Sequence, residues 1–203
     1  MTEYPKIPTV WKRDPATNNK RLLHGVWSTP ELAYLQTCDW HWTEKVDGTN
    51  IRVMYEPPET LRYGGRTDNA QIPAQLVTAL DTLFRPKLEM MQNMFTDTPV
   101  CFYGEGYGAG IQSGGNYRKD MGFALFDIRI GVWLTHVEDI ATSLGIPMVP
   151  VIGSGLIVRG QVAAVVAVAM PVAVVHGLLH VVQLALLRPR QAGASEQGQG
   201  HAS

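Results

Sequence analysis

The stretch EKVDGTN, residues 44–50, is the most informative part of this chain, because it sets a lysine, an acid and a glycine at the spacing K-x-D-G. Asp47 stands two residues after Lys45, so in an extended segment both side chains project to the same side. Gly48 permits a tight turn and a close approach of a ligand to the backbone. The stretch is therefore expected to be a loop that presents an amine beside a carboxylate.

Three further elements follow in order: GRTDN at 65–69, FYGEG at 102–106 and FALFDI at 123–128. Together with residues 44–50 they resemble the covalent nucleotidyltransferases, the superfamily of ATP-dependent ligases and capping enzymes. The resemblance is closest to the phage-type ATP-dependent RNA ligases, whose first motif often reads E-K-x-x-G-T-N. It covers about residues 4–155, and it implies ATP and Mg²⁺ or Mn²⁺ as cofactors and RNA ends as the partner, with a nicked duplex or DNA as further substrates.

The chemistry of such a site depends on an unprotonated lysine. A solution pKa near 10.4 leaves only about four lysines in ten thousand neutral at pH 7. Burial and nearby positive charge, including a bound Mg²⁺, would lower that pKa. By the resemblance, Lys45 is the catalytic residue that forms a lysyl-AMP intermediate as pyrophosphate leaves. Asp47 would orient the amine or contact the ribose, and Gly48 would let the nucleotide approach.

The other site residues take roles that the resemblance implies. Arg66 would contact phosphate, because a planar guanidinium binds two oxygens at once. Glu44 would recognise the adenine edge, and Glu105 would accept hydrogen bonds from ribose hydroxyls. Phe126 would stack on the adenine, since an aromatic face suits any purine. Asp127 would face the metal or phosphate region.

The pattern of apolar residues predicts an α+β fold with antiparallel sheets and flanking helices. By the resemblance this is a ligase-type, ATP-grasp-like nucleotidyltransferase domain that is incomplete at its C-terminus. Thr29 and Pro30 predict a helix start, and alternation after Lys45 predicts a strand. The predicted helices are 31–35, 73–84, 86–95 and 137–144, and the predicted strands are 51–55, 61–63, 100–103 and 123–128.

The amino-acid composition limits the expected location of the protein and the extent of any surface that binds nucleic acid. The 203 residues carry a formal net charge of −1, so any nucleic-acid surface must be local. The two cysteines are far apart, and the first residues contain no apolar run, so a cytoplasmic location with reduced thiols is expected. The basic candidates for nucleic-acid contacts are Lys6, Lys12, Arg13, Lys20, Arg21, Arg52, Arg62, Arg66, Arg118 and Lys119.

The composition changes at about residue 155, which divides the chain into a partial nucleotidyltransferase domain, 1–155, and an atypical tail, 156–203. From residue 157 onward there is no Lys, Asp, Phe, Tyr or Trp, and Glu196 is the only acid. Residues 162–187 are uncharged and exceed the roughly 20 residues that cross a bilayer. Three interpretations stay open: an aberrant or replaced C-terminus, a membrane or interfacial helix, and a buried helical pair. His176 and His180 could also chelate a metal, although that spacing is mostly incidental.

Two elements of the resembled family are missing. One is an E-G-x-V-x-R strand that holds metal, which residues 155–159 half-match with Ser154 in place of the acid. The other is a closing K-x-K strand, and there is no lysine after Lys119. Ligation by this chain is therefore expected to be impaired. The loss also predicts apolar surface left exposed around Phe102 and Phe126.

Other functions remain open. A catalytically inactive nucleotide- or nucleic-acid-binding module would keep Arg66, Glu105 and Phe126 without forming an adduct. A DNA ligase or a GTP-using capping enzyme would share the same superfamily motifs. A tail-anchored protein would reach a membrane only through residues 162–187.

Overall fold

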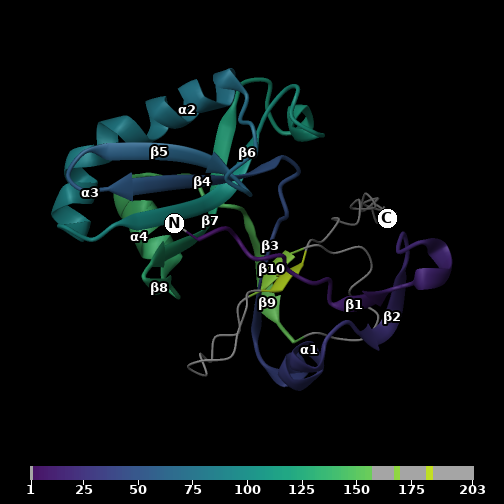
Figure 1. The fold of residues 1–203 in the computed structure, drawn as a ribbon. Helices are drawn as coiled ribbons and strands as arrows, with labels where there is room; N and C mark the ends of the chain where they lie inside the picture. The colour runs from purple at the N-terminus through teal and green to yellow at the C-terminus, as the bar shows by residue number, and fades with distance from the viewer. Residues whose placement is uncertain (1, 157–166, 170–181, 185–203) are drawn as a thin grey trace, which may run out of the picture.

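The structure is a computed structural model that describes residues 2–156, 167–169 and 182–184. Its largest part is a five-stranded sheet with the strand order β5-β4-β6-β7-β8, in which every neighbouring pair is antiparallel. The α+β prediction is therefore confirmed (Figure 1). The strands are β4 Thr49–Glu56, β5 Thr60–Gly65, β6 Val100–Tyr107, β7 Gly122–Ile130 and β8 Val132–Trp133.

Three helices pack on this sheet: α2 Ala74–Phe84, α3 Leu88–Phe95 and α4 Val137–Leu144. The alternation in β4 sends Ile51, Val53 and Tyr55 into the core that these helices cover. The helix predicted over 86–95 begins two residues late, after a 3-10 turn, Arg85–Lys87, that contains Pro86. Proline has no N–H to donate, so the regular helix starts after it.

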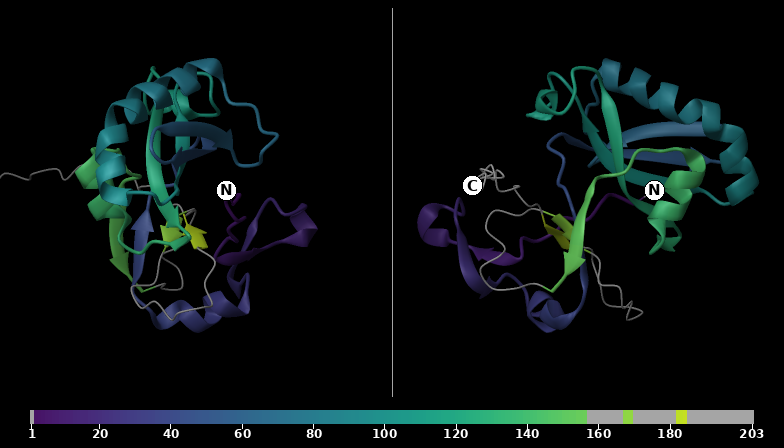
Figure 2. Two further views of the ribbon diagram at one scale, coloured as in Figure 1. Left: turned by 60° about the vertical axis from the view of Figure 1, so that its left-hand side comes forward. Right: turned by 180° about the vertical axis from the view of Figure 1, so that it is seen from behind.

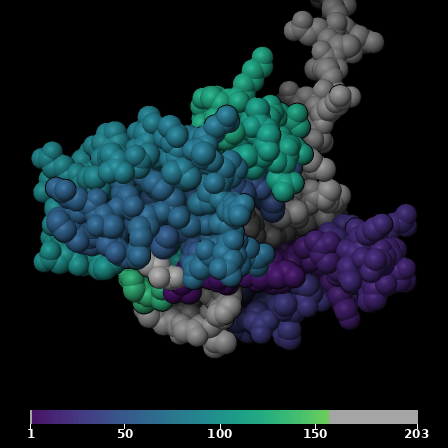
Figure 3. All heavy atoms as spheres, turned by 45° about the horizontal axis from the view of Figure 1, so that its top comes forward, coloured from purple at the N-terminus to yellow at the C-terminus, as the bar shows by residue number. Residues whose placement is uncertain are grey.

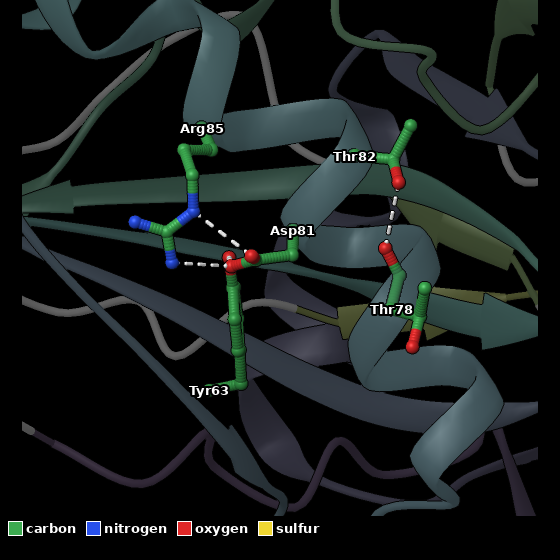
Figure 4. A network of polar contacts seen from close by, with 5 residues as sticks. All are labelled: Tyr63, Thr78, Asp81, Thr82 and Arg85. Carbon is green, nitrogen blue, oxygen red and sulfur yellow. Dashed lines mark hydrogen bonds and ion pairs between the residues drawn. The ribbon is translucent and has the colours of Figure 1, made fainter.

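A polar network ties α2 to the edge strand β5 (Figure 4). The Tyr63 hydroxyl donates to Asp81 Oδ1 at 2.7 Å, and the Arg85 guanidinium donates to both oxygens of the same carboxylate at 2.8 Å. Burial, and then the bond to Asp81, raise the pKa of the Tyr63 hydroxyl. One carboxylate thus satisfies two donors and holds the helix against the sheet edge.

A second group of elements lies beside the sheet (Figure 2). The strand β3 Trp40–Thr43 pairs antiparallel with β9 Val151–Gly155, and β1 Trp11–Arg13 pairs antiparallel with β2 Leu22–Trp27. In α1 Pro30–Tyr34, Thr29 Oγ1 accepts from the Leu32 N–H at 3.4 Å, as the predicted N-cap requires. The remaining 3-10 helices are Pro15–Thr17, Leu35–Thr37 and Gly114–Asn116.

Little of the tail is described. The strands β10 Ala167–Ala169 and β11 Val182–Leu184 pair antiparallel, and β10 lies close to β3. The rest of the candidate span 162–187, including His176 and His180, lies outside the described residues. Among the described helices, none is both long and apolar enough to cross a membrane.

The expectation of exposed apolar surface at Phe102 and Phe126 is wrong. Phe102 is fully buried and packs against Phe84 and Phe95 from the helices. Phe126 is 7% exposed, because Tyr4 from the N-terminal segment lies against its ring. Helices and the N-terminal segment cover the surface that the missing strands were expected to cover.

Gly104 provides a test of this packing. A Cβ at this position in β6 would lie 2.3 Å from the Phe123 ring and 2.6 Å from the Ala124 carbonyl oxygen. We expect Gly104→Ala to lower the free energy of unfolding by about 1–3 kcal/mol or more, the usual cost of overpacking. Urea denaturation measures this change.

Gly153→Ala, in the strand β9, is the matched control, because a Cβ at this position would have no atom within 4 Å. We expect its effect to stay within about 0.5 kcal/mol. Equal effects of the two substitutions would contradict the packing described for β6 and β7.

Candidate active site

Lys45 lies in the connection between β3 and β4, and two contacts anchor this loop. The Glu44 N–H donates to the Pro150 carbonyl at 2.8 Å. The Val46 side chain is buried in an apolar cluster with Phe126 and Tyr4. Because Val46 points inward, its neighbours Lys45 and Asp47 flank it and remain half-buried. The predicted loop is thus present, and its apolar residue holds it in place.

Glu105 lies against the Lys45 loop. The pairing of β4 with β6 puts Glu105 opposite Asn50, and the Gly48 N–H donates to the Glu105 carboxylate. Burial raises the pKa of Glu105 to about 7, and the positive charge of Lys45 opposes this shift. The structure therefore brings Lys45, Gly48 and Glu105 together from two distant segments.

Gly48 is required by packing. A Cβ at Gly48 would lie 2.2 Å from the Gly106 carbonyl oxygen and 3.1 Å from Glu105 Cγ. Any side chain would separate the loop from β6 and so move Lys45 away from Glu105. The sequence prediction gave Gly48 a role in approaching the nucleotide, whereas the contact seen in the structure is between two backbone segments.

A connection that sequence reasoning missed closes over the Lys45 loop. It joins β6 to β7 and includes the 3-10 helix Gly114–Asn116. The Ser113 N–H donates to Asp47 Oδ2 at 3.2 Å. The Tyr117 hydroxyl interacts with the Glu44 carboxylate and the Asp47 backbone, and burial followed by the charge of Glu44 raises its pKa. No sequence motif marked Tyr117, whose partners lie about 70 residues earlier.

Asn50 carries an unpaired acceptor at this site. Its Oδ1 atom is buried and has no hydrogen-bond partner within the part of the chain that the structure describes. Buried polar atoms are almost always hydrogen-bonded, so this oxygen is suited to a donor that the protein itself does not supply. An amine or hydroxyl group of a ligand would be such a donor.

Arg66 and Arg52, two of the basic residues singled out in the sequence, lie in different surroundings. Arg66 lies on an exposed loop after β5. Arg52, taken as a candidate for nucleic-acid contact, is 1% exposed, so that assignment is wrong. Its Nε donates to the Gly65 carbonyl at 2.8 Å, and its guanidinium pairs with Asp68 Oδ1 at 2.7 Å. Arg52 thereby fixes both sides of the loop that carries Arg66.

Phe126 and Asp127 lie in β7, where the N-terminal segment packs against them. Phe126 shares the apolar cluster of Val46, and its ring centroid is 4.9 Å from that of Tyr4. Asp127 is 1% exposed, and its Oδ2 accepts from the Tyr4 hydroxyl at 2.5 Å. Burial raises the pKa of Asp127 to about 7, and the bond from Tyr4 opposes this. Both residues thus face the N-terminal segment.

The N-terminal segment is held to the sheet by further bonds. The Tyr103 hydroxyl donates to the Thr2 carbonyl at 2.7 Å, and Arg129 donates to Thr2 Oγ1 at 2.5 Å.

Within the described residues, no group of three or more His, Cys, Asp or Glu side chains could hold a metal ion. The carboxylates nearest Lys45 are those of Glu44, Asp47 and Glu105.

Comparisons with known proteins show a family and a set of similar folds. A family model described as RNA ligase matches residues 39–181. A Naegleria gruberi RNA ligase variant with AMP and Mn has a TM-score of 0.54 at 19% identity and covers 66% of this chain and 42% of that chain. A second variant with AMP and Mn gives 0.54 and 19%, covering 68% and 44%. A third, with ATP and Mn, gives 0.51 and 20%, also covering 68% and 44%.

This chain therefore spans less than half the length of those ligases, and at these identities the likeness is one of fold. The comparison with curated protein sequences gives no match.

The Tyr4–Asp127 contact makes a pH-dependent prediction. Because the pKa of Asp127 is raised in the folded state, the stability gained by its neutral form is present below about pH 4 and is lost as pH rises through about 7. Tyr4→Phe removes the bond that stabilises the charged form. We expect it to cost about 1.5–3 kcal/mol at pH 8 and less at pH 5, measured by urea denaturation at both values.

Asp127→Asn supplies the control, because its side chain does not titrate. In that background the cost of Tyr4→Phe should be equal at the two pH values. Glu105 titrates in the same range, so the measured quantity is the difference between variants with and without Tyr4. An equal cost of Tyr4→Phe at pH 5 and pH 8 in the unaltered background would refute the coupling.

Proposed function

This chain belongs to the RNA ligase family, and from that membership we propose that it carries the adenylation site of an ATP-dependent RNA ligase. Lys45 Nζ attacks the α-phosphorus of ATP, a P–N bond forms, and the bond to pyrophosphate breaks. The AMP is then transferred to a 5′-phosphate end. A 3′-hydroxyl attacks that end, the strands are sealed, and AMP leaves.

One observation carries the proposal: Lys45, Gly48 and Glu105 converge beside the unpaired Asn50 oxygen. A carboxylate with a pKa of about 7 is charged in only about half of the molecules at pH 7, whereas an ordinary one is almost fully charged. Glu105 is therefore partly neutral beside Lys45 at pH 7.

The other residues then act on the nucleotide. Glu44 recognises the adenine edge, Asp47 orients the Lys45 amine, and Glu105 accepts from the ribose hydroxyls. Arg66, on the loop that Arg52 and Asp68 hold, reaches phosphate. Phe126 would stack on the adenine once Tyr4 moves from its ring.

Asp127 would serve the metal or phosphate side of the site only if its hydrogen bond from Tyr4 opened.

The Naegleria ligase structures hold ATP or AMP together with Mn, which supports ATP and Mg²⁺ or Mn²⁺ as cofactors for this chain. Mg²⁺ is usually held by one or two carboxylates together with phosphates and water. The described site, with Glu44, Asp47 and Glu105 but no cluster of three ligands, fits that mode. Such an ion would offset phosphate charge when bound.

The adenylation step is tested by incubation with α-labelled ATP. We expect a label on the 203-residue chain that is stable to alkali, labile to acid as a P–N phosphoramidate is, and absent in Lys45→Ala. Lys87→Ala, in the 3-10 turn Arg85–Lys87, is the control and should keep the label. A label that survives Lys45→Ala would contradict the assignment of Lys45 as the adenylated residue. A label from GTP in place of ATP would indicate a capping-type enzyme.

Sealing is a separate prediction, because residues 120–203 contain no lysine to form a K-x-K strand. Loss of one positioned charge-stabilising group typically costs about 10²–10³ in rate. We expect the 203-residue chain to seal nicked RNA at least about 10²-fold more slowly than an intact relative, with the same assay on nicked DNA as comparison.

A sealing rate within tenfold of the relative would show that the tail supplies the missing groups. ATP binding at equilibrium without any Lys45 adduct would instead identify an inactive nucleotide-binding module, the alternative that the missing motifs favour.

A further inference from the structure

Positive charge is concentrated on the hairpin formed by β1 and β2. Residues 11–27 contain Lys12, Arg13, Lys20 and Arg21 but only one acid, Asp14, which gives the segment a net charge of +3. The whole chain has a net charge of −1, so the remaining residues together carry −4. Residues 28–156 are acidic, so this hairpin contrasts with the part of the chain that carries the sheet and the Lys45 loop.

The four hairpin cations are exposed and have no carboxylate partner among the described residues. Arg13 donates to the Asn19 carbonyl at 2.9 Å, which leaves its charge uncompensated. Asp14 is already engaged, because its carboxylate accepts from the Ala16 N–H at 2.9 Å. Elsewhere the exposed Arg62, Arg85 and Arg118 are paired with Glu56, Asp81 and Asp120, whereas Arg66 and Lys119 are isolated exposed cations without a carboxylate partner among the described residues.

The hairpin is rigidly connected to the strand that leads to Lys45. Trp11 of β1 and Trp27 of β2 pack with their ring centroids 4.6 Å apart. Trp11 also belongs to a buried cluster with Trp40 and Trp42 of β3. The Lys45 loop begins directly after β3. The hairpin and the strand that leads to Lys45 therefore share one apolar cluster.

From this charge and placement we propose that the β1–β2 hairpin binds the phosphate backbone of the RNA substrate. The inference rests on the proposed function in taking RNA as the polyanion. Lysine and arginine contacts to phosphate supply affinity and position without reading sequence. Figure 3 shows the hairpin, in purple, projecting from the body of the molecule. An anionic membrane fits less well, because Val26 is the hairpin's only large exposed apolar side chain.

The test uses two double variants of the 203-residue chain, Lys12→Ala with Arg13→Ala and Lys20→Ala with Arg21→Ala. Affinity for a 5′-phosphorylated single-stranded RNA is measured over a series of salt concentrations. Each lost phosphate contact should reduce the slope of log affinity against log salt by about 0.7. Each double variant is therefore expected to lower the slope by about 1.4 and to weaken binding irrespective of RNA sequence.

Arg62→Ala with Arg85→Ala is the matched control, because it removes two exposed arginines whose charge is already paired. Its salt slope should equal that of the unaltered chain. Unchanged slopes in both hairpin variants, or no RNA binding by the unaltered chain, would overturn the proposal. Binding to phosphatidylserine vesicles that exceeds RNA binding and falls in the same variants would assign the hairpin to a membrane instead.

The Lys45 label separates this inference from the proposed function, because adenylation needs no RNA. The hairpin variants should keep the label of the unaltered chain. A normal label with unchanged RNA slopes would refute the hairpin inference alone. An absent label with reduced RNA slopes would refute adenylation and leave the hairpin as a nucleic-acid surface.

Discussion

The antiparallel pairing of β4 with β6 is the constraint on which the candidate site depends. It sets Asn50 opposite Glu105, and it brings Gly48 so close to Gly106 that no side chain fits between them. A shift of one residue in this register would turn Glu105 into the helix-covered core and leave a glycine, Gly104 or Gly106, in its place opposite Asn50. The hydrophobic pattern of β4 prevents that shift, since Ile51, Val53 and Tyr55 must stay buried. Core packing thereby fixes the chemistry of the opposite face.

That opposite face buries polar groups, and each is stabilised differently. Arg52 keeps its charge at 1% exposure because a carbonyl and a carboxylate accept its hydrogen bonds. Asp127 has a single donor, Tyr4, and burial shifts its pKa toward neutrality. Glu105 lies between these cases, because its carboxylate accepts from the Gly48 N–H and lies near the positive charge of Lys45, while burial raises its pKa. Because a buried charge without partners is costly, these differences determine which groups are ionised at neutral pH.

Most helices and several strands could be predicted from local sequence patterns, although some of their boundaries differ in the structure. Thr29 and Pro30 fixed the start of α1, and the apolar stripe from Leu76 to Phe84 fixed α2. The strands β1, β2, β8 and β9 were not predicted. In β9 the glycines and serine give no strand signal, and the strand forms by pairing with β3. Arg52 was taken for a surface residue, since a basic side chain in a strand gives no local sign of the loop that buries it. Tyr117 was missed as well, because nothing in its local sequence indicates that its partners are Glu44 and Asp47.

By itself, the sequence determined which segments hold the candidate nucleophile and the candidate nucleotide contacts, and which family they resemble, because short motifs and hydrophobic periodicity are local properties of the chain. Only the tertiary structure decided that Tyr4 covers Phe126 and Asp127, that Arg52 supports the Arg66 loop, and that Tyr117 reaches Glu44. These contacts join residues far apart in the chain, and they form because the sheet register and the burial of the intervening core bring them together.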